Sequence, residues 1–99
     1  IVFVNVNYVN QGPSLRLLTT YVGGGTWVIS GNVTDPDDDL SDFIVQFYGV
    51  FTTRTAVDEN GYFEFAIALN EGEWGQVWAW TFDSHGVPSN VVPFLIGLT

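Results

Sequence analysis

The feature that most constrains this chain is the regular spacing of its turn-forming residues. Short runs of alternating apolar and polar residues are separated by Gly, Asn, Asp and Pro about every 8–12 residues. Apolar residues at helical spacing are almost absent, so the pattern predicts strands rather than helices. The predicted strands cover residues 14–22, 26–34, 43–48, 51–57, 62–69, 75–82 and 91–98, after an extended lead-in over 1–9. Seven short strands at this spacing predict a small all-β sandwich.

The composition supports a packed core rather than disorder. Of the 99 residues, 46% are hydrophobic and 16% are aromatic, which is enough for one domain with a core. The chain has no Cys, so we expect neither a disulfide framework nor a thiolate metal site. It also has no Met and no segment resembling a signal peptide, which indicates a piece of a longer polypeptide. We therefore expect one domain over residues 13–99, with residues 1–12 as a lead-in strand or linker.

The charge balance excludes several classes of partner. The formal net charge is -9, and the only Lys or Arg residues are Arg16 and Arg54. Nothing in the chain could neutralise a run of phosphates, so nucleic acid is excluded, and an anionic membrane surface would repel the protein. No apolar run is long enough to cross a bilayer, so we expect no membrane insertion. A field of this sign attracts cations, Ca²⁺ among them.

An ordered set of short motifs runs through the chain. They are Trp27-x-Ile29-x-Gly31-x-Val33-x-Asp35, Val45-x-Phe47-x-Gly49, Val57-Asp58-x-x-Gly61-x-Phe63 and Gly75-x-Val77-x-Ala79-x-Thr81-x-Asp83-x-x-Gly86-x-x-Ser89. In this order the motifs resemble the bacterial Ig-like and cadherin-like repeat domains of large secreted or cell-surface proteins, over residues 13–98. The resemblance implies an all-β, seven-stranded Ig-like Greek-key β-sandwich. It also implies a tandem array with neighbouring domains of the same chain, and a spacer or adhesion role.

Polar residues indicate which face of each strand is wet. Glu64 points the opposite way from Phe63, so the Phe63 side of its strand is predicted to be buried. Gln46 and Gln76 mark the outward faces of two further strands, which are neighbours in an Ig-type topology. Their outward side chains would merge into one apolar face. That face consists of Ile44, Tyr48, Trp78, Trp80 and Phe82.

This aromatic face has three interpretations. Trp78 and Trp80 belong to the core if the strand phase is wrong. Alternatively, residues 1–12 or a neighbouring repeat cover the face. The third interpretation is a ligand-binding platform, since sugar C–H groups pack on aromatic rings while the hydroxyl groups stay hydrated. The candidate ligand-binding residues are Tyr48, Trp78 and Trp80, with a glycan or a surface protein as the partner.

Eight acidic residues fall in three loops that the predicted topology brings to one end of the sandwich. They are Asp35, Asp37, Asp38, Asp39, Asp42, Asp58, Glu59 and Asp83. Like charges this close repel one another, and Ca²⁺ would relieve the repulsion. The candidate metal ligands are Asp35, Asp37, Asp39 and Asp83. The alternative is a solvated acidic loop, with Asp58 and Asp83 bonded to backbone N–H groups as Asx turns in two Asp-x-x-Gly motifs.

The sequence gives no basis for catalysis. The single His, His85, adjoins Asp83 and Ser84 in a predicted turn, where adjacent residues cannot converge as nucleophile, base and orienting group. We therefore predict a protein that is not an enzyme. It is expected to be a secreted or cell-surface spacer or adhesion module stabilised by Ca²⁺ at its acidic loops. The alternative is a carbohydrate- or protein-binding module that uses the aromatic face.

Overall fold

The computed structural model describes residues 12–36 and 39–97. The predicted lead-in over 1–9 and the acidic residues Asp37 and Asp38 therefore lie outside the described residues, and the domain boundary at residue 13 stays a prediction. The elements are β1 (Ser14–Gly23), β2 (Thr26–Thr34), the 3-10 turn η1 (Leu40–Asp42), β3 (Ile44–Gly49), β4 (Thr53–Ala56), β5 (Tyr62–Ala68), β6 (Gly75–Trp80) and β7 (Val92–Ile96). All seven predicted strands are confirmed, with small differences at their ends.

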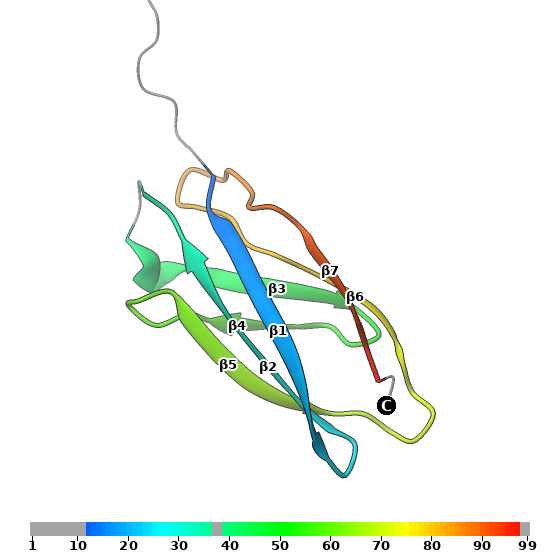
Figure 1. Ribbon diagram of the computed structural model, residues 1–99. Coiled ribbons are helices and arrows are strands. Elements are labelled where there is room, and N and C mark those ends of the chain that lie inside the picture. The colour runs from blue at the N-terminus through cyan, green and yellow to red at the C-terminus, as the bar shows by residue number, and fades with distance from the viewer. Residues whose placement is uncertain (1–11, 37–38, 98–99) are drawn as a thin grey trace, which may run out of the picture.

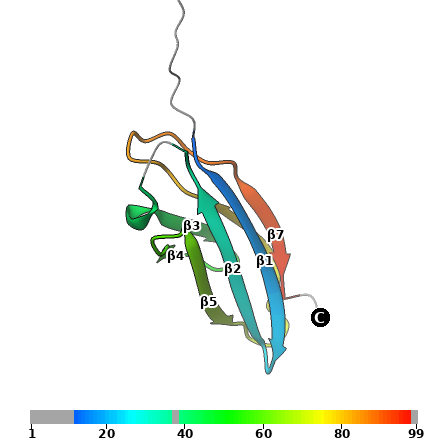
Figure 2. The same ribbon diagram turned by 60° about the vertical axis from the view of Figure 1, so that its left-hand side comes forward.

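The strands form two antiparallel sheets that face each other (Figure 1, Figure 2). The first sheet has the order β1-β2-β5, and the second has the order β4-β3-β6-β7. The chain leaves the first sheet after β2, returns to it as β5, and leaves it again for β6. This is the predicted Ig-like sandwich, in which β3 and β6 are neighbours although β4 and β5 lie between them in the sequence.

Alternate residues of both sheets meet in a dry core around Phe47. Its ring lies 5.1 Å from that of Phe65 and 6.1 Å from that of Phe63, centroid to centroid, both edge-on. Edge-to-face contacts of this kind add to the area that the rings bury. The buried hydrophobic residues are Leu15, Trp27, Ile29, Val33, Phe43, Val45, Phe47, Val57, Phe63, Val77, Ala79 and Ile96. The inward phase predicted for β3, β5 and β6 is therefore confirmed.

The two ends of the sandwich differ, and we name them by their loops. The acidic pole comprises the loops over residues 35–43, 57–61 and 81–91. The hairpin pole comprises the β1–β2 hairpin and the β5–β6 turn over residues 69–74. The chain enters β1 at the acidic pole and leaves β7 at the hairpin pole (Figure 1). The described residues include no helix that is long and apolar enough to cross a membrane.

Candidate functional site

The outer face of the four-stranded sheet carries the predicted aromatic strip. Tyr48 on β3 lies directly opposite Trp78 on β6, and Gln46 lies opposite Trp80. Trp78 in turn lies opposite Pro93 on β7. Side chains directly opposite each other on one face of an antiparallel pair are in contact range. Tyr48, Trp78 and Pro93 therefore form one continuous row across three strands.

The exposure of these rings bears on the interpretation that placed Trp78 and Trp80 in the core. Tyr48 is 61% exposed and Trp78 is 41% exposed, so neither belongs to the core of this domain. Trp80 is half-buried, which leaves it a smaller share of the contact surface than the sequence suggested. The face also extends onto β7 through the exposed Leu95, which sequence analysis did not assign to it. The alternating pattern of residues 91–98 could have predicted this, because it places Leu95 on the same side of the strand as Pro93.

The aromatic face also differs from the rest of the molecule in charge. The chain has 11 Asp and Glu residues, but none of them lies within β3, β4, β6 or β7. The charged side chain within these four strands is Arg54 on β4, which lies opposite Gln46. An apolar, acid-free face on a chain of net charge -9 is a part of the described surface that a neutral partner could cover without desolvating carboxylates.

The three acidic loops do converge at one pole. The backbone N–H of Val33 donates to the Gly61 carbonyl at 2.8 Å, and that of Val57 donates to the Phe43 carbonyl at 3.3 Å. A cavity of about 190 Å³ at the same end is lined by Asp39, Asp42, Phe43, Phe82, Asp83 and Ser84. The structure thus brings Asp39 and Asp83 to a shared cavity with Asp42. Asp35 does not line this cavity, and Asp37 lies outside the described residues.

The carboxylates of the acidic pole bind backbone donors. Asp39 Oδ1 accepts from the Ser41 backbone N–H at 3.0 Å and from Ser41 Oγ at 2.9 Å. These bonds, chiefly the backbone one, hold the pKa of Asp39 below its ordinary value of 3.8. Asp58 Oδ1 and Asp83 Oδ1 each accept two backbone N–H groups within an Asx turn. Among residues 12–36 and 39–97, no group of three or more Asp, Glu, His or Cys side chains is arranged to hold a metal ion.

The geometry around His85 also gives no positive sign of catalysis. The Ser84 hydroxyl lies 3.4 Å from His85 Nδ1, and both residues are exposed. Asp83 Oδ1 accepts the backbone N–H of His85 at 2.8 Å rather than orienting its ring. A nucleophile–base–orienter relay requires the side chains themselves to converge, and the contacts among these three residues do not supply that arrangement.

The sheet order and the register define the fold of this protein as an Ig-like β-sandwich. A comparison with solved structures finds the same fold in the PKD domain of an M14-like peptidase from Thermoplasmatales archaeon SCGC AB-540-F20. The TM-score is 0.69 at 14% sequence identity, and the match covers 91% of this chain and 98% of that domain. No family model and no curated protein matches the chain. The comparison therefore identifies the fold and leaves the function to be inferred from the molecule.

Proposed function

We propose that the chain is a non-catalytic spacer or adhesion module of a longer secreted or cell-surface polypeptide, of the bacterial repeat-domain type. The observation that carries this proposal is the placement of the two ends of the fold. β1 begins at the acidic pole and β7 ends at the hairpin pole, so neighbouring domains joined to either end would extend in opposite directions (Figure 2). The nine residues of β2 span about 30 Å, which sets the length that one module adds. The similar PKD domain is by its name one part of a peptidase, which supports a modular role.

Small-angle X-ray scattering on one copy and on two copies joined in tandem tests the spacer function. We expect the maximum dimension to rise by about 30 Å when the second copy is added, since strand length sets the module length. A second pair joined by a long Gly-Ser linker is the matched control, because it should show a broader distribution of distances. Two copies packed side by side, with little gain in length, would contradict the spacer function.

A second candidate function, recognition of a neutral glycan, is favoured by the aromatic face. Its support is the Tyr48–Trp78 row, which is exposed and free of acidic residues. Flat, paired rings suit the apolar faces of sugars. Tyr48 and Trp78 would provide the main stacking surfaces, and the half-buried Trp80 would contribute an edge.

The glycan function is tested by comparing two Trp substitutions on a glycan array. Trp78→Ala removes a ring from the aromatic face, whereas Trp74→Ala removes a 57% exposed ring from the β5–β6 turn. We expect binding to be lost with Trp78→Ala and kept with Trp74→Ala. Equal glycan binding by both variants would contradict the glycan function. Binding of a protein partner without binding of any glycan would instead indicate protein adhesion.

Calcium remains part of the proposal as a weak stabiliser of the acidic pole. Its support is the density of negative charge in three converging loops and the cavity shared by Asp39, Asp42 and Asp83. Asp35 and Asp37 stay in the proposed ligand set because hard cations take oxygen ligands from several positions of one loop.

A further inference from the structure

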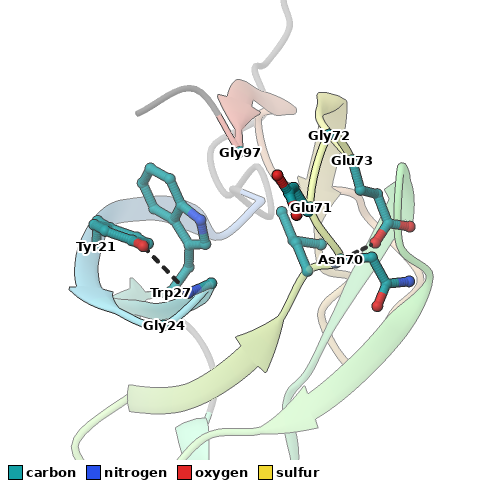
Figure 3. Close-up of a pocket in the computed structure, with 10 residues that line it drawn as sticks. Tyr21, Gly24, Trp27, Asn70, Glu71, Gly72, Glu73 and Gly97 are labelled. Carbon is teal, nitrogen blue, oxygen red and sulfur yellow. Dashed lines mark hydrogen bonds between the residues drawn. The ribbon is translucent and has the colours of Figure 1, made fainter.

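A second cavity lies at the hairpin pole, away from both the aromatic face and the acidic loops. Its volume is about 300 Å³, at the lower end of the range for small-ligand sites. The β1–β2 hairpin forms one wall and the β5–β6 turn forms the other (Figure 3). Gly97, which follows β7, also lines it. Three separate parts of the chain therefore meet around one opening.

The hairpin wall is aromatic. Tyr21 and Trp27 lie opposite each other in the β1–β2 register, with ring centroids 5.0 Å apart and planes tilted by 52°. Tyr21 is 43% exposed, whereas Trp27 is largely buried and shows only part of its ring. The Tyr21 hydroxyl accepts a hydrogen bond from the Gly25 backbone N–H at 3.2 Å, which ties the ring to its own hairpin. The aromatic wall is thus fixed before any ligand arrives.

The opposite wall is acidic and equally fixed. The backbone N–H of Glu73 donates to the Asn70 carbonyl at 3.0 Å, and the backbone N–H of Asn70 donates to Glu73 Oε1 at 2.9 Å. This reciprocal pair fixes the turn and holds the Glu73 carboxylate on the side away from Tyr21 and Trp27, whereas Glu71 lies on the side that faces them (Figure 3). The backbone N–H of Leu69 donates to the Gly25 carbonyl at 2.9 Å and fastens this wall to the hairpin.

The lining discriminates among ligand classes. A hard metal ion takes six or so oxygen ligands, and the described residues provide no group of three or more acidic or His side chains for one. A neutral sugar would gain nothing from the negative charge of the acidic wall, which is the feature that distinguishes this cavity from the aromatic face. An organic cation fits better, because aromatic faces attract it and carboxylates form charge-assisted bonds with it.

We propose that this cavity binds a cationic side chain, the ammonium of Lys or the guanidinium of Arg, presented by a protein partner. The aromatic wall of Tyr21 and Trp27 would contact the aliphatic stem and the charge, and Glu71 would accept its hydrogen bonds. The cation has to come from another polypeptide or domain, because this chain has no Lys, and Arg54 and Arg16 lie on β4 and near the start of β1. The site is independent of the spacer and glycan functions.

An NMR titration with three short peptides tests the site. The peptides are acetyl-Gly-Lys-Gly-amide, the same peptide with Arg, and the same peptide with uncharged norleucine. We expect the Lys or the Arg peptide to shift the indole N–H of Trp27 and the backbone amides of Gly24 and Gly72, while the indole N–H of Trp78 stays in place. The norleucine peptide should leave all four signals unmoved, since it keeps the apolar stem and lacks the charge.

Charge-matched variants distinguish this site from general attraction to an acidic protein. Glu71→Gln should weaken binding about tenfold, because it removes a charge-assisted hydrogen bond. Glu59→Gln removes the same charge at the acidic pole and should change affinity less than about twofold at physiological salt, where charges are screened. Equal weakening by Glu59→Gln and Glu71→Gln, or shifts caused by N-acetylglucosamine but by neither charged peptide, would overturn the proposal.

Discussion

Two turns of this protein share one sequence pattern and one set of hydrogen bonds. In Asp58–Gly61 and in Asp83–Gly86 the Gly N–H donates to the Asp carbonyl, at 2.9 and 3.0 Å respectively. Each Asp Oδ1 accepts two further backbone N–H groups. These belong to Asn60 and Tyr62 at 2.8 and 2.9 Å, and to His85 and Val87, both at 2.8 Å. The Asx turns that the Asp-x-x-Gly motifs predict are therefore confirmed at both places.

The surroundings of the two turns are different. Asp58 is exposed, whereas Asp83 is only 6% exposed because the β6–β7 loop encloses it. The two glycines differ in the opposite sense, since the space around Gly61 is filled and the space around Gly86 is open. A Cβ on Gly61 would overlap the Val33 carbonyl oxygen, and a Cβ on Gly86 would meet nothing within 4 Å. A motif therefore specifies local geometry, while its environment decides whether the Asp or the Gly is the critical residue.

The largest effect is expected from Gly61→Ala. Gly61 has φ +84°, which strains any residue with a Cβ, and the new methyl would also collide with the backbone of β2. The strain and the collision together should lower the free energy of unfolding by about 4 kcal/mol. Gly86→Ala is the matched control, since φ is +81° but the space is open, and we expect about 1 kcal/mol. Equal losses in urea denaturation would show that the environment of Gly61 does not matter.

The next largest effect is expected from Asp83→Ala. The substitution leaves the N–H groups of His85 and Val87 without their acceptor in a partly buried turn, and the two lost bonds together should cost about 3 kcal/mol. Asp83→Asn keeps an oxygen at the same position and should recover more than half of that loss. Thermal and urea unfolding measure both variants. If Asn were no better than Ala, the charge rather than the turn geometry would be what Asp83 contributes.

Asp58→Ala removes the same bonds from an exposed turn, so the expected loss is smaller, about 1 kcal/mol. Water can replace the carboxylate as the partner of the Asn60 and Tyr62 N–H groups. The difference between the two Asp→Ala variants, measured under identical conditions, is the direct test of the comparison. A loss at Asp58 as large as that at Asp83 would mean that burial does not set the importance of these turns.

Local patterns explain why the strands and the two turns could be predicted. A strand alternates with a period of two, so a single polar residue such as Gln46 or Gln76 fixes the phase of the whole element. An Asp followed three positions later by a Gly favours a turn that involves only a few residues. These features depend on neighbours in the sequence. The outward position of Tyr48 and Trp78 followed from the same reasoning together with one topological assumption, that β3 and β6 are adjacent.

Features that depend on several distant segments escaped prediction. The burial of Asp83 requires the β6–β7 loop to close, and Thr81 and Ser89 bring this about with mutual backbone and side-chain bonds. Trp80, opposite Gln46, is half-buried while Trp78 is exposed, and the alternating pattern of the strand does not distinguish the two residues. The cavity at the hairpin pole joins Trp27 to Glu73 through the β2–β5 register and the bond between Leu69 and Gly25. No short motif encodes any of these contacts.

Calcium offers a further test of whether Asp83 serves only its turn. Extracellular calcium sites often bind at about 1 mM, and at about 5 mM Ca²⁺ such a site would add about 1 kcal/mol of stability. We expect a rise of this size in the wild type and its loss in Asp42→Asn, which removes a carboxylate from the cavity that Asp83 lines. Glu64→Gln, with the same change of charge on β5, should keep the rise. An equal rise with NaCl at matched ionic strength would reduce the effect to charge screening.

The smallest effect is expected at Asp39, which extends the comparison to a turn without a glycine. Its folded-state pKa lies below the unfolded value of 3.8 because Ser41 donates to the ionised carboxylate. The stabilisation is therefore fully present above that unfolded value and is lost as the pH falls through the lower folded pKa. Ser41→Ala removes only the hydroxyl donor, so its stability deficit should be small at pH 6 and should shrink as the pH falls through the folded-state pKa of Asp39. A deficit that stays constant as the pH falls would show that Ser41 acts by packing rather than through Asp39. Asp39 could then no longer be compared with Asp58 and Asp83 as a third turn stabilised by its carboxylate.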